Sequence, residues 1–275
     1  MNNLIFDVPL INGKSNATVA EISKLLTKKY RMQNKLFVCD GIKLFKEAVN
    51  ANAKIKYIVI DNNASLDNEV VLLIKECVKK GTKILCVEKY IFEKLTTENA
   101  PQGIITVCEF YDLKHTISLD LSQIDLEEKS IIILESVRDP GNMGTILRNA
   151  CAFGIDKLVL SSDCADIYSP KVVRSSMGAI FKLDIHIVDD LKNAIEHLKS
   201  EGRRVLAAAI DDTALILGKD KVSRGDVVVL GNEGHGISPD LIEKCSNKIF
   251  IPMKGNTESL NVAMASAVIM WEISK

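Results

Sequence analysis

Apolar, often β-branched runs alternate with amphipathic stretches along the whole chain. Four runs in the first half predict strands: residues 35–39, 55–60, 83–87 and 104–108. The stretches between and before them have helical periodicity: residues 17–29, 42–51, 68–80 and 89–95. This β-α alternation predicts a small sheet with helices packed on its faces.

The alternation resumes more strongly in the second half. Its predicted strands are residues 130–135, 157–161, 184–188, 204–210, 226–230 and 248–252. Its predicted helices are residues 144–153, 170–177, 190–200, 240–244 and 259–273. Several of these strands are apolar at consecutive positions, which is typical of parallel strands covered on both faces.

Between the two halves, residues 111–129 are polar and lack a long apolar run. We therefore predict an α/β protein of two domains, residues 1–120 and residues 121–275. Of the 275 residues, 47% are hydrophobic and 26% are charged, the balance of a globular protein. No stretch approaches the roughly 18 apolar residues of a membrane span, and the first residues do not resemble a secretory signal. These features predict a soluble, cytoplasmic protein without a membrane partner.

The seven cysteines contain no C-x-x-C pair and lie mostly in apolar runs, and the four histidines are scattered. Zinc sites and disulfide frameworks need clustered or paired cysteines. We therefore expect buried thiols and no metal.

The net charge of −1 conceals an asymmetry, because residues 14–56 carry ten Lys or Arg against three Asp or Glu. Such a basic stretch is either a solvated helix face or a footprint for nucleic acid.

Three loops of the second half carry candidate chemistry. In the first, residues 135–154, a strand passes through a glycine-containing loop into a helix expected near Gly144. The backbone N–H groups of a helix N-terminus suit a phosphate or carboxylate. Asn142 is a candidate N-cap, and Arg148 lies near enough along the helix to share an anionic ligand. The spacing is not G-x-G-x-x-G, which argues against a nucleotide-dependent oxidoreductase.

The second loop, residues 230–238, follows a buried strand and holds three glycines. In open α/β sheets, ligands bind beyond the carboxyl ends of the strands. Its Glu233 would seek a basic partner such as Arg148. The third loop leads into the last predicted helix, where Ser259 and Asn261 are placed to cap the helix or to contact a ligand.

Taken together, these loops resemble a known family. They carry N-x-G-[ST]-x-x-R from Asn142 to Arg148, G-N-E-G-x-G at residues 231–236 and S-L-N-V-A at residues 259–263. In this order and at these separations they resemble the three motifs of the SpoU (TrmH) branch of the SPOUT RNA ribose methyltransferases. The resemblance covers residues 130–275. More loosely, residues 23–41 resemble the family's ribosomal-protein-like RNA-binding domain, with Asp40-Gly41 where relatives usually have Glu-Gly.

The resemblance implies a parallel-sheet domain with a deep trefoil knot, S-adenosylmethionine as cofactor and a homodimer formed through the C-terminal domains. The implied cofactor site comprises residues 230–234, 251–253 and 259–263, together with the strand end at residues 207–209. Its candidate residues are Ala208, Leu230, Gly231, Asn232, Gly234, Ile251, Met253 and Leu260.

The implied reaction is methyl transfer to a ribose 2′-hydroxyl. Arg148 would favour ionisation of the hydroxyl and bind the acceptor's phosphate, since guanidinium is too basic to act as the base itself. Asn142 would orient the ribose and Glu233 would hold Arg148, while Ser259 and Asn261 would shape the site. His235 occupies a variable position, where a passive role is expected.

The same resemblance gives the basic stretch a partner, RNA. The implied RNA-binding residues are Lys24, Lys28, Lys29, Arg31, Lys35 and Arg174, with Ser175 as a secondary candidate. Ribosomal RNA is the favoured substrate, because two-domain members more often modify it. The alternatives are a transfer RNA 2′-O-methyltransferase and a non-catalytic RNA-binding protein of the same fold; the second predicts erosion of the first motif, yet Asn142, Gly144 and Arg148 are all present.

Overall fold

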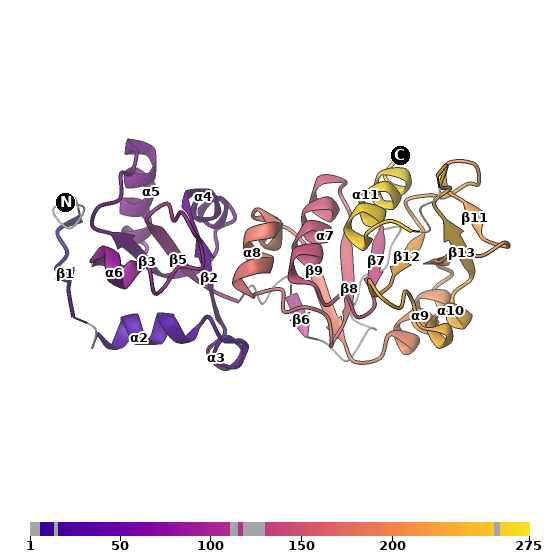
Figure 1. Ribbon diagram of the computed structural model, residues 1–275, viewed down its shortest axis with the longest axis horizontal. Helices are drawn as coiled ribbons and strands as arrows, with labels where there is room; N and C mark the ends of the chain where they lie inside the picture. Colours follow the sequence, from indigo (N-terminus) through magenta and orange to yellow (C-terminus); the bar gives the residue numbers. More distant parts are fainter. Residues whose placement is uncertain (1–5, 14–15, 111–114, 118–129, 256–258) are drawn as a thin grey trace. The chain divides into compact units, whose positions relative to one another are not determined.

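The computed structural model describes residues 6–13, 16–110, 115–117, 130–255 and 259–275 (Figure 1). The chain folds into two compact units, each described by itself below. The first comprises Met1–Tyr111 with Asp166–Phe181, and the second comprises Asp112–Ala165 with Lys182–Lys275. The domain boundary expected near residue 120 lies outside the described residues and stays a prediction.

The first unit contains a five-stranded sheet in the order β1-β4-β3-β5-β2. Its strands are β1 (Leu10–Ile11), β2 (Leu36–Asp40), β3 (Ile55–Asp61), β4 (Lys83–Val87) and β5 (Ile104–Glu109). β1, β3 and β4 run parallel, whereas β5 is antiparallel to both β2 and β3. The N-terminal ends of β2, β3 and β4 therefore lie at the same edge of the sheet as the C-terminal end of β5.

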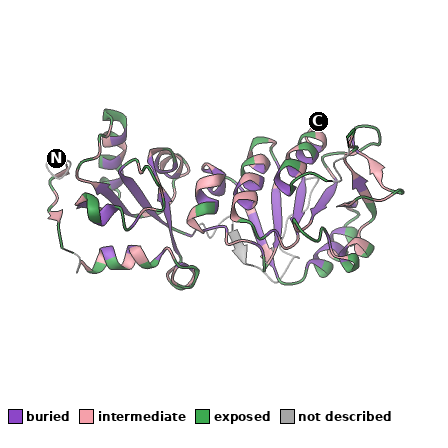
Figure 2. Ribbon diagram, in the orientation of Figure 1, coloured by how far each residue is buried: buried purple, intermediate pink, exposed green. Residues whose placement is uncertain are grey.

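Helices cover both faces of this sheet. They are α2 (Ala17–Lys24), α3 (Lys28–Asn34), α4 (Ile42–Asn50), α5 (Asn68–Lys79) and α6 (Lys89–Phe92). One core cluster joins Val59 and Val107 to Ile22 of α2 and Phe92 of α6. A second cluster joins the next residues of β3 to Phe45 and Ile74 of α4 and α5, so the strands are buried on both sides (Figure 2).

The helix expected over residues 17–29 is two helices, α2 and α3. The Thr27 hydroxyl donates to the carbonyl oxygen of Lys24 at 2.9 Å, and Arg31 Nη1 donates to that of Leu25 at 2.7 Å. These side chains satisfy carbonyl groups at the end of α2, and Thr27 itself is extended. A threonine that bonds its local backbone in this way competes with helix continuation.

The segment Asp166–Phe181 belongs to the first unit, although the sequence assigned it to the second domain. It contains α8 (Pro170–Ser176), which packs on β2. The Tyr168 ring stacks on Phe110 with centroids 3.8 Å apart and lies 4.8 Å from Phe37. Aromatic packing thus joins this segment to the sheet, which binary patterning does not reveal.

The second unit is built on an eight-stranded, wholly parallel sheet in the order β11-β13-β10-β12-β7-β8-β9-β6. The six predicted strands are β7 (Ile131–Leu134), β8 (Lys157–Ser161), β9 (Asp184–Val188), β10 (Val205–Ala208), β12 (Val227–Leu230) and β13 (Asn247–Phe250). The short strands β6 (His115–Ile117) and β11 (Leu215–Ile216) were not predicted. The predicted α/β fold class is confirmed; the trefoil knot stays a prediction.

Two pairs of helices cover this sheet. α9 (Leu191–Ser200) and α10 (Pro239–Lys244) pack against a core that includes Ile131, Ile133 and Val229. α7 (Pro140–Ala152) and α11 (Val262–Ile273) lie on the opposite face of the sheet from α9 and α10 (Figure 1). The alternate residues of each strand face that side. Within the described ranges, every helix is too short or too polar to cross a bilayer.

Candidate functional site

The first motif forms the turn from β7 into α7, and the helix begins earlier than expected. Asp139, not Asn142, is the N-cap: its Oδ1 accepts from the Asn142 backbone N–H at 2.8 Å. Pro140 occupies the first helical position, which it favours because its missing N–H needs no partner there. The predicted capping role of Asn142 is therefore wrong, and its side chain is free for other contacts.

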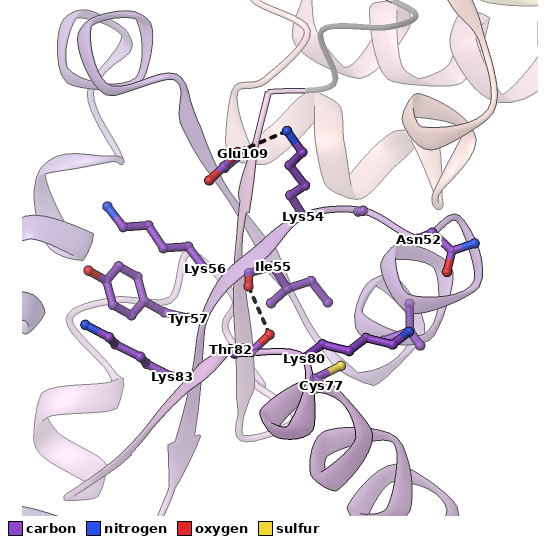
Figure 3. Close-up of a pocket in the computed structure, with 13 residues that line it drawn as sticks. Asn52, Lys54, Ile55, Lys56, Tyr57, Cys77, Lys80, Thr82, Lys83 and Glu109 are labelled. Carbon is purple, nitrogen blue, oxygen red and sulfur yellow. Dashed lines mark hydrogen bonds and ion pairs between the residues drawn. The ribbon is translucent and has the colours of Figure 1, made fainter.

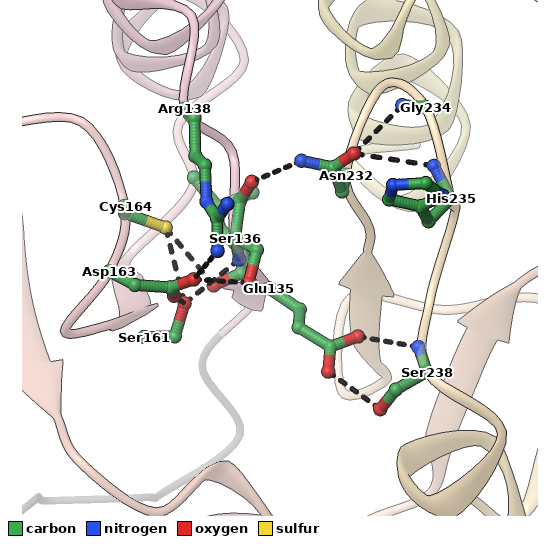
Figure 4. A network of polar contacts seen from close by, with 11 residues as sticks. Glu135, Ser136, Arg138, Ser161, Asp163, Cys164, Asn232, Gly234, His235 and Ser238 are labelled. Atoms are coloured by element: carbon green, nitrogen blue, oxygen red, sulfur yellow. Dashed lines mark hydrogen bonds and ion pairs between the residues drawn. The ribbon is translucent and has the colours of Figure 1, made fainter.

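The second motif follows β12 and folds back on itself, with a bridge between Asn232 and Gly236. A Cβ at Gly231 would lie 2.2 Å from the carbonyl carbon of Gly236, so only glycine fits there. Asn232 Oδ1 accepts from the N–H groups of Gly234 and His235, and its Nδ2 donates to the Ser136 carbonyl oxygen at 2.7 Å (Figure 4). The loop thus has a fixed shape.

The third motif leads into α11, which begins at Val262, three residues later than expected. Asn261 is its N-cap, and its Oδ1 accepts from the N–H groups of Ala263 and Met264. Ser259 and Leu260 precede the helix and are exposed. The capping expected of Asn261 is present, and its amide nitrogen remains available.

Asn142 joins the three motifs through its side chain. Its Nδ2 donates to Glu233 Oε1 at 2.9 Å, and its Oδ1 accepts from Asn261 Nδ2 at 3.1 Å. All three side chains extend from loops or helix starts beyond the carboxyl ends of parallel strands, where ligands bind in α/β sheets. We call Asn142, Glu233 and Asn261 the motif cluster.

Arg148 is not part of the motif cluster, contrary to the expected pairing with Glu233. It is exposed on α7, and within the described residues it makes no hydrogen bond or ion pair. Six residues advance about 600° around a helix, so Arg148 projects roughly 120° away from Asn142. Glu233 accepts from the Asn142 amide instead.

Two adjoining cavities lie beside the motif cluster, with volumes of about 410 and 120 Å³. The strand end at Ala208–Ile210 and the residues before α11 line both cavities. The eight residues predicted to bind a cofactor all line one or both: Ala208, Leu230, Gly231, Asn232, Gly234, Ile251, Met253 and Leu260. Glu233 lines the larger cavity, and Ser259 lines both.

A polar network that the sequence analysis missed supports these loops (Figure 4). At the end of β7, the Glu135 carboxylate accepts from the N–H and the hydroxyl of Ser238, which fixes the end of the second loop. Burial disfavours the charge of Asp163, but hydrogen bonds from Arg138 and from two serines outweigh it and lower its pKa to about 2. A charged residue directly after an apolar strand, such as Glu135, is the signal that could have identified it.

The lysines predicted to bind RNA lie exposed on the first unit. They are Lys24, Lys28, Lys29 and Lys35. Lys24 lies over the Tyr30 ring, and Lys35 lies over the Phe110 ring at 5.5 Å from its centroid.

The two arginines of the predicted RNA-binding set have protein partners. Arg31 is 3% exposed, and its Nη2 lies 2.6 Å from Asp166 Oδ2. A buried, paired guanidinium is not available to a phosphate, so the structure assigns Arg31 a structural role instead. Arg174 is half-buried and pairs with Glu98.

Known proteins share both parts of this architecture. The model of the SpoU rRNA methylase family matches residues 129–271, and that of an MRM3-like substrate-binding domain matches residues 16–106. The 23S rRNA (guanosine(2553)-2′-O)-methyltransferase RlmP of Bacillus subtilis is 28% identical over 96% of this chain and 98% of its own. The 23S rRNA (guanosine-2′-O-)-methyltransferase RlmB of Coxiella burnetii is 30% identical over 76% of this chain and 83% of its own.

Solved structures agree. The AdoMet-bound rRNA methyltransferase of Sinorhizobium meliloti superposes with a TM-score of 0.83 at 27% identity, over 96% of each chain. The SpoU methyltransferase AviRb of Streptomyces viridochromogenes has a TM-score of 0.79 at 24% identity, over 94% of this chain and 97% of its own, which supports the fold.

Proposed function

The chain belongs to the SpoU rRNA methylase family, and we propose that it methylates a ribose 2′-hydroxyl of ribosomal RNA with S-adenosylmethionine as methyl donor. One observation carries the proposal. Side chains from three separate motifs form one hydrogen-bonded cluster beside the cavities lined by every predicted cofactor residue.

The cavities suit an adenosyl group. Leu230, Ile251 and Leu260 supply apolar surface, and Ala208 leaves room for a flat ring. The carbonyl oxygens of residues 231–236 offer acceptors that side chains need not provide, whereas the N–H groups of Asn232, Gly234, His235 and Gly236 are bonded within the loop. The close approach of Gly236 to Gly231 fixes these peptide groups in advance of binding, which lowers its entropic cost.

When bound, S-adenosylmethionine supplies an electrophilic methyl group and leaves as a neutral thioether. The chain's own residues must hold the ribose hydroxyl in line and favour its ionisation. Asn142 is placed to orient the ribose, since Glu233 and Asn261 fix its amide in one orientation. Ser259 shapes the cavity wall. Within one chain Arg148 projects away from Asn142, so its positive charge would act on an acceptor held by a partner copy.

Ribosomal RNA is favoured over transfer RNA by the extent of the match. The Bacillus subtilis relative, named for 23S rRNA, matches across both units. The exposed Lys24, Lys28, Lys29 and Lys35 supply positive charge on the unit whose family model is a substrate-binding domain. Such a substrate would place the protein in the cytoplasm.

We also infer a homodimer formed through the second unit. On α11, Met264, Val268 and Trp271 are exposed at spacings that place them on one face. Large apolar side chains exposed together mark an association surface. Arg148, exposed on the neighbouring α7, would then complete a site shared by two copies.

The test is transfer of labelled methyl from S-adenosylmethionine to separated ribosomal and transfer RNAs. Alkali digestion follows, because a 2′-O-methyl group blocks cleavage at its nucleotide. We expect label in alkali-resistant dinucleotides of ribosomal RNA, lost in Arg148→Ala and kept in Arg224→Ala. Arg224 is an exposed arginine of the same unit that pairs with Asp156, outside the motif cluster and its cavities.

Three outcomes would contradict parts of the proposal. Label found only in transfer RNA would mean that transfer RNA, and not ribosomal RNA, is the substrate. Full activity of Arg148→Ala would remove the role of that arginine. The absence of both labelling and cofactor binding would favour the alternative of a non-catalytic RNA-binding protein.

A further inference from the structure

The first unit contains a cavity of about 520 Å³ that lies outside the predicted RNA-binding residues (Figure 3). It lies at the edge of the sheet where β3 and β4 begin and β5 ends. Its charged lining consists of Lys54, Lys56, Lys80, Lys83 and a single acidic residue, Glu109. The cavity therefore has an excess of positive charge.

Much of this charge is available to a ligand. Lys54 Nζ is 3.9 Å from Glu109 Oε2 and is 82% exposed, and Lys56 Nζ lies 3.3 Å from Glu21 Oε1. Lys80 and Lys83 are exposed, and across the described part of the chain neither forms an ion pair. A Cβ at Gly81 would meet nothing within 4 Å, so space is open between them.

The sheet topology extends the charge beyond the cavity. Leu36, at the start of β2, pairs with Glu109, and the Glu109 N–H donates to the Lys54 carbonyl oxygen. Lys35 therefore lies in the same row of strand ends. We call Lys35, Lys54, Lys56, Lys80 and Lys83 the basic edge.

The opposite edge of the same sheet has the other sign. β2 and β3 end at Asp40 and Asp61, and Glu88 follows β4. A polyanion approaching this unit is therefore attracted to one edge of the sheet and repelled from the other.

We propose that the cavity of the basic edge binds phosphates of the substrate RNA backbone. The inference rests on the proposed function and adds a binding surface to it. Lysine ammonium groups act as point charges for phosphate without reading bases, so this surface positions RNA but does not select sequence. Lys80 and Lys83 are central because they are exposed and without an ion-pair partner in the described ranges.

The test compares Lys80→Gln/Lys83→Gln with the control Lys75→Gln/Lys94→Gln, which removes two exposed lysines of the same unit that do not line the cavity. RNA affinity is measured as a function of salt for the ribosomal RNA that the wild type methylates. Log K falls as log salt rises, and each lost phosphate contact makes this negative slope less steep by roughly 0.7–0.9. For the double variant we expect the slope to become less steep by about 1.5 and the affinity at 0.1 M salt to fall by about tenfold or more.

The same variant should keep the wild-type affinity for S-adenosylmethionine and the wild-type kcat at saturating RNA. A Lys80→Arg/Lys83→Arg variant should restore affinity, because it restores charge. If Lys80→Gln/Lys83→Gln binds RNA as the control does, the inference is wrong while the proposed function stands. If the wild type methylates no RNA, the proposed function fails first, and binding of rRNA fragments still tests the basic edge.

Discussion

The motif cluster and the basic edge differ in how firmly their polar side chains are held. In the second unit, Asn142 donates a hydrogen bond to one other motif and accepts one from another, and the neighbouring loops are held by Glu135 and Asn232. In the first unit, Lys80 at the end of α5 and Lys83 at the start of β4 are exposed and have no ion-pair partner among the residues described. Methyl transfer needs aligned atoms, whereas attraction of a polyanion needs only charge of the right sign.

The largest expected effect concerns Arg31, a charged residue of the first unit that is buried and paired instead of exposed. Asp166→Asn would leave its guanidinium buried without a charged partner, at a cost of about 3–4 kcal/mol in the free energy of unfolding. Urea denaturation of the full chain measures this. The control Lys28→Gln should remain within about 0.5 kcal/mol of the wild type, since its side chain is exposed. Equal stability of the two variants would mean that Arg31 belongs with the exposed charges.

The next effect tests how rigid the second loop must be. Gly231→Ala forces a Cβ against the Gly236 backbone, whereas Gly234→Ala meets only Asn232 Oδ1 at 3.4 Å. Overpacking of this kind costs about 1–3 kcal/mol. Where this cost destabilises the loop conformation that binds the cofactor, the affinity for S-adenosylmethionine weakens by roughly ten- to a hundredfold. Calorimetric titration should show near-normal binding for Gly234→Ala, and equal losses in both variants would contradict a specific steric role.

A smaller loss is expected when the motif cluster is broken at its centre. Asn142→Ala removes two hydrogen bonds, and we expect kcat to fall by about tenfold with a lesser change in KM for RNA. Asn149→Ala is the matched control on the same helix. Its Nδ2 donates to the Ala263 carbonyl oxygen and to Ser266 Oγ, so its loss should reduce stability and leave kcat of the folded enzyme intact. If only the KM for RNA rises and kcat is unchanged, Asn142 contributes to RNA binding, as the basic edge does, and not to methyl transfer.

The smallest effect concerns the partly exposed pair of Arg138 and Asp163. Because the pKa of Asp163 is lowered from 3.8 to about 2, its stabilising contribution is fully present above about pH 4 and is lost as the pH falls through about 2. Asp163→Asn should therefore cost under about 1 kcal/mol at pH 7. The difference from wild type should vanish in acid, as measured by urea denaturation at several pH values. A difference that grows in acid would have the wrong sign for this pair.

The sequence predicted the motif cluster better than the basic edge for a physical reason. Residues 142, 233 and 261 lie within three motifs that together resemble those of a known family, so one sequence is enough to identify them. Lys80 and Lys83 belong to no motif, and they lie beside Lys54 and Lys56 only because β3 and β4 are adjacent and parallel. The start of α7 is four residues earlier than predicted, since Asp139 and Pro140 form a better N-terminus than Asn142, and the start of α11 is three residues later.

Similar limits apply to Arg31 and to the helix expected over residues 17–29. Composition placed Arg31 among exposed basic residues, but its partner Asp166 is 135 positions away in sequence. The interruption after Lys24 depends on side-chain hydrogen bonds from Thr27 and Arg31, which periodicity does not register.

The discontinuity of the first unit has a consequence for the order of synthesis. Residues 166–181 supply Asp166 and Tyr168, which neutralise Arg31 and cover Phe37 and Phe110. On the ribosome, the sheet of this unit is complete some seventy residues before its last packing segment is translated. During that interval the nascent chain carries an unpaired arginine beside an uncovered aromatic surface, and a gene fragment that stops near residue 120 would carry both permanently.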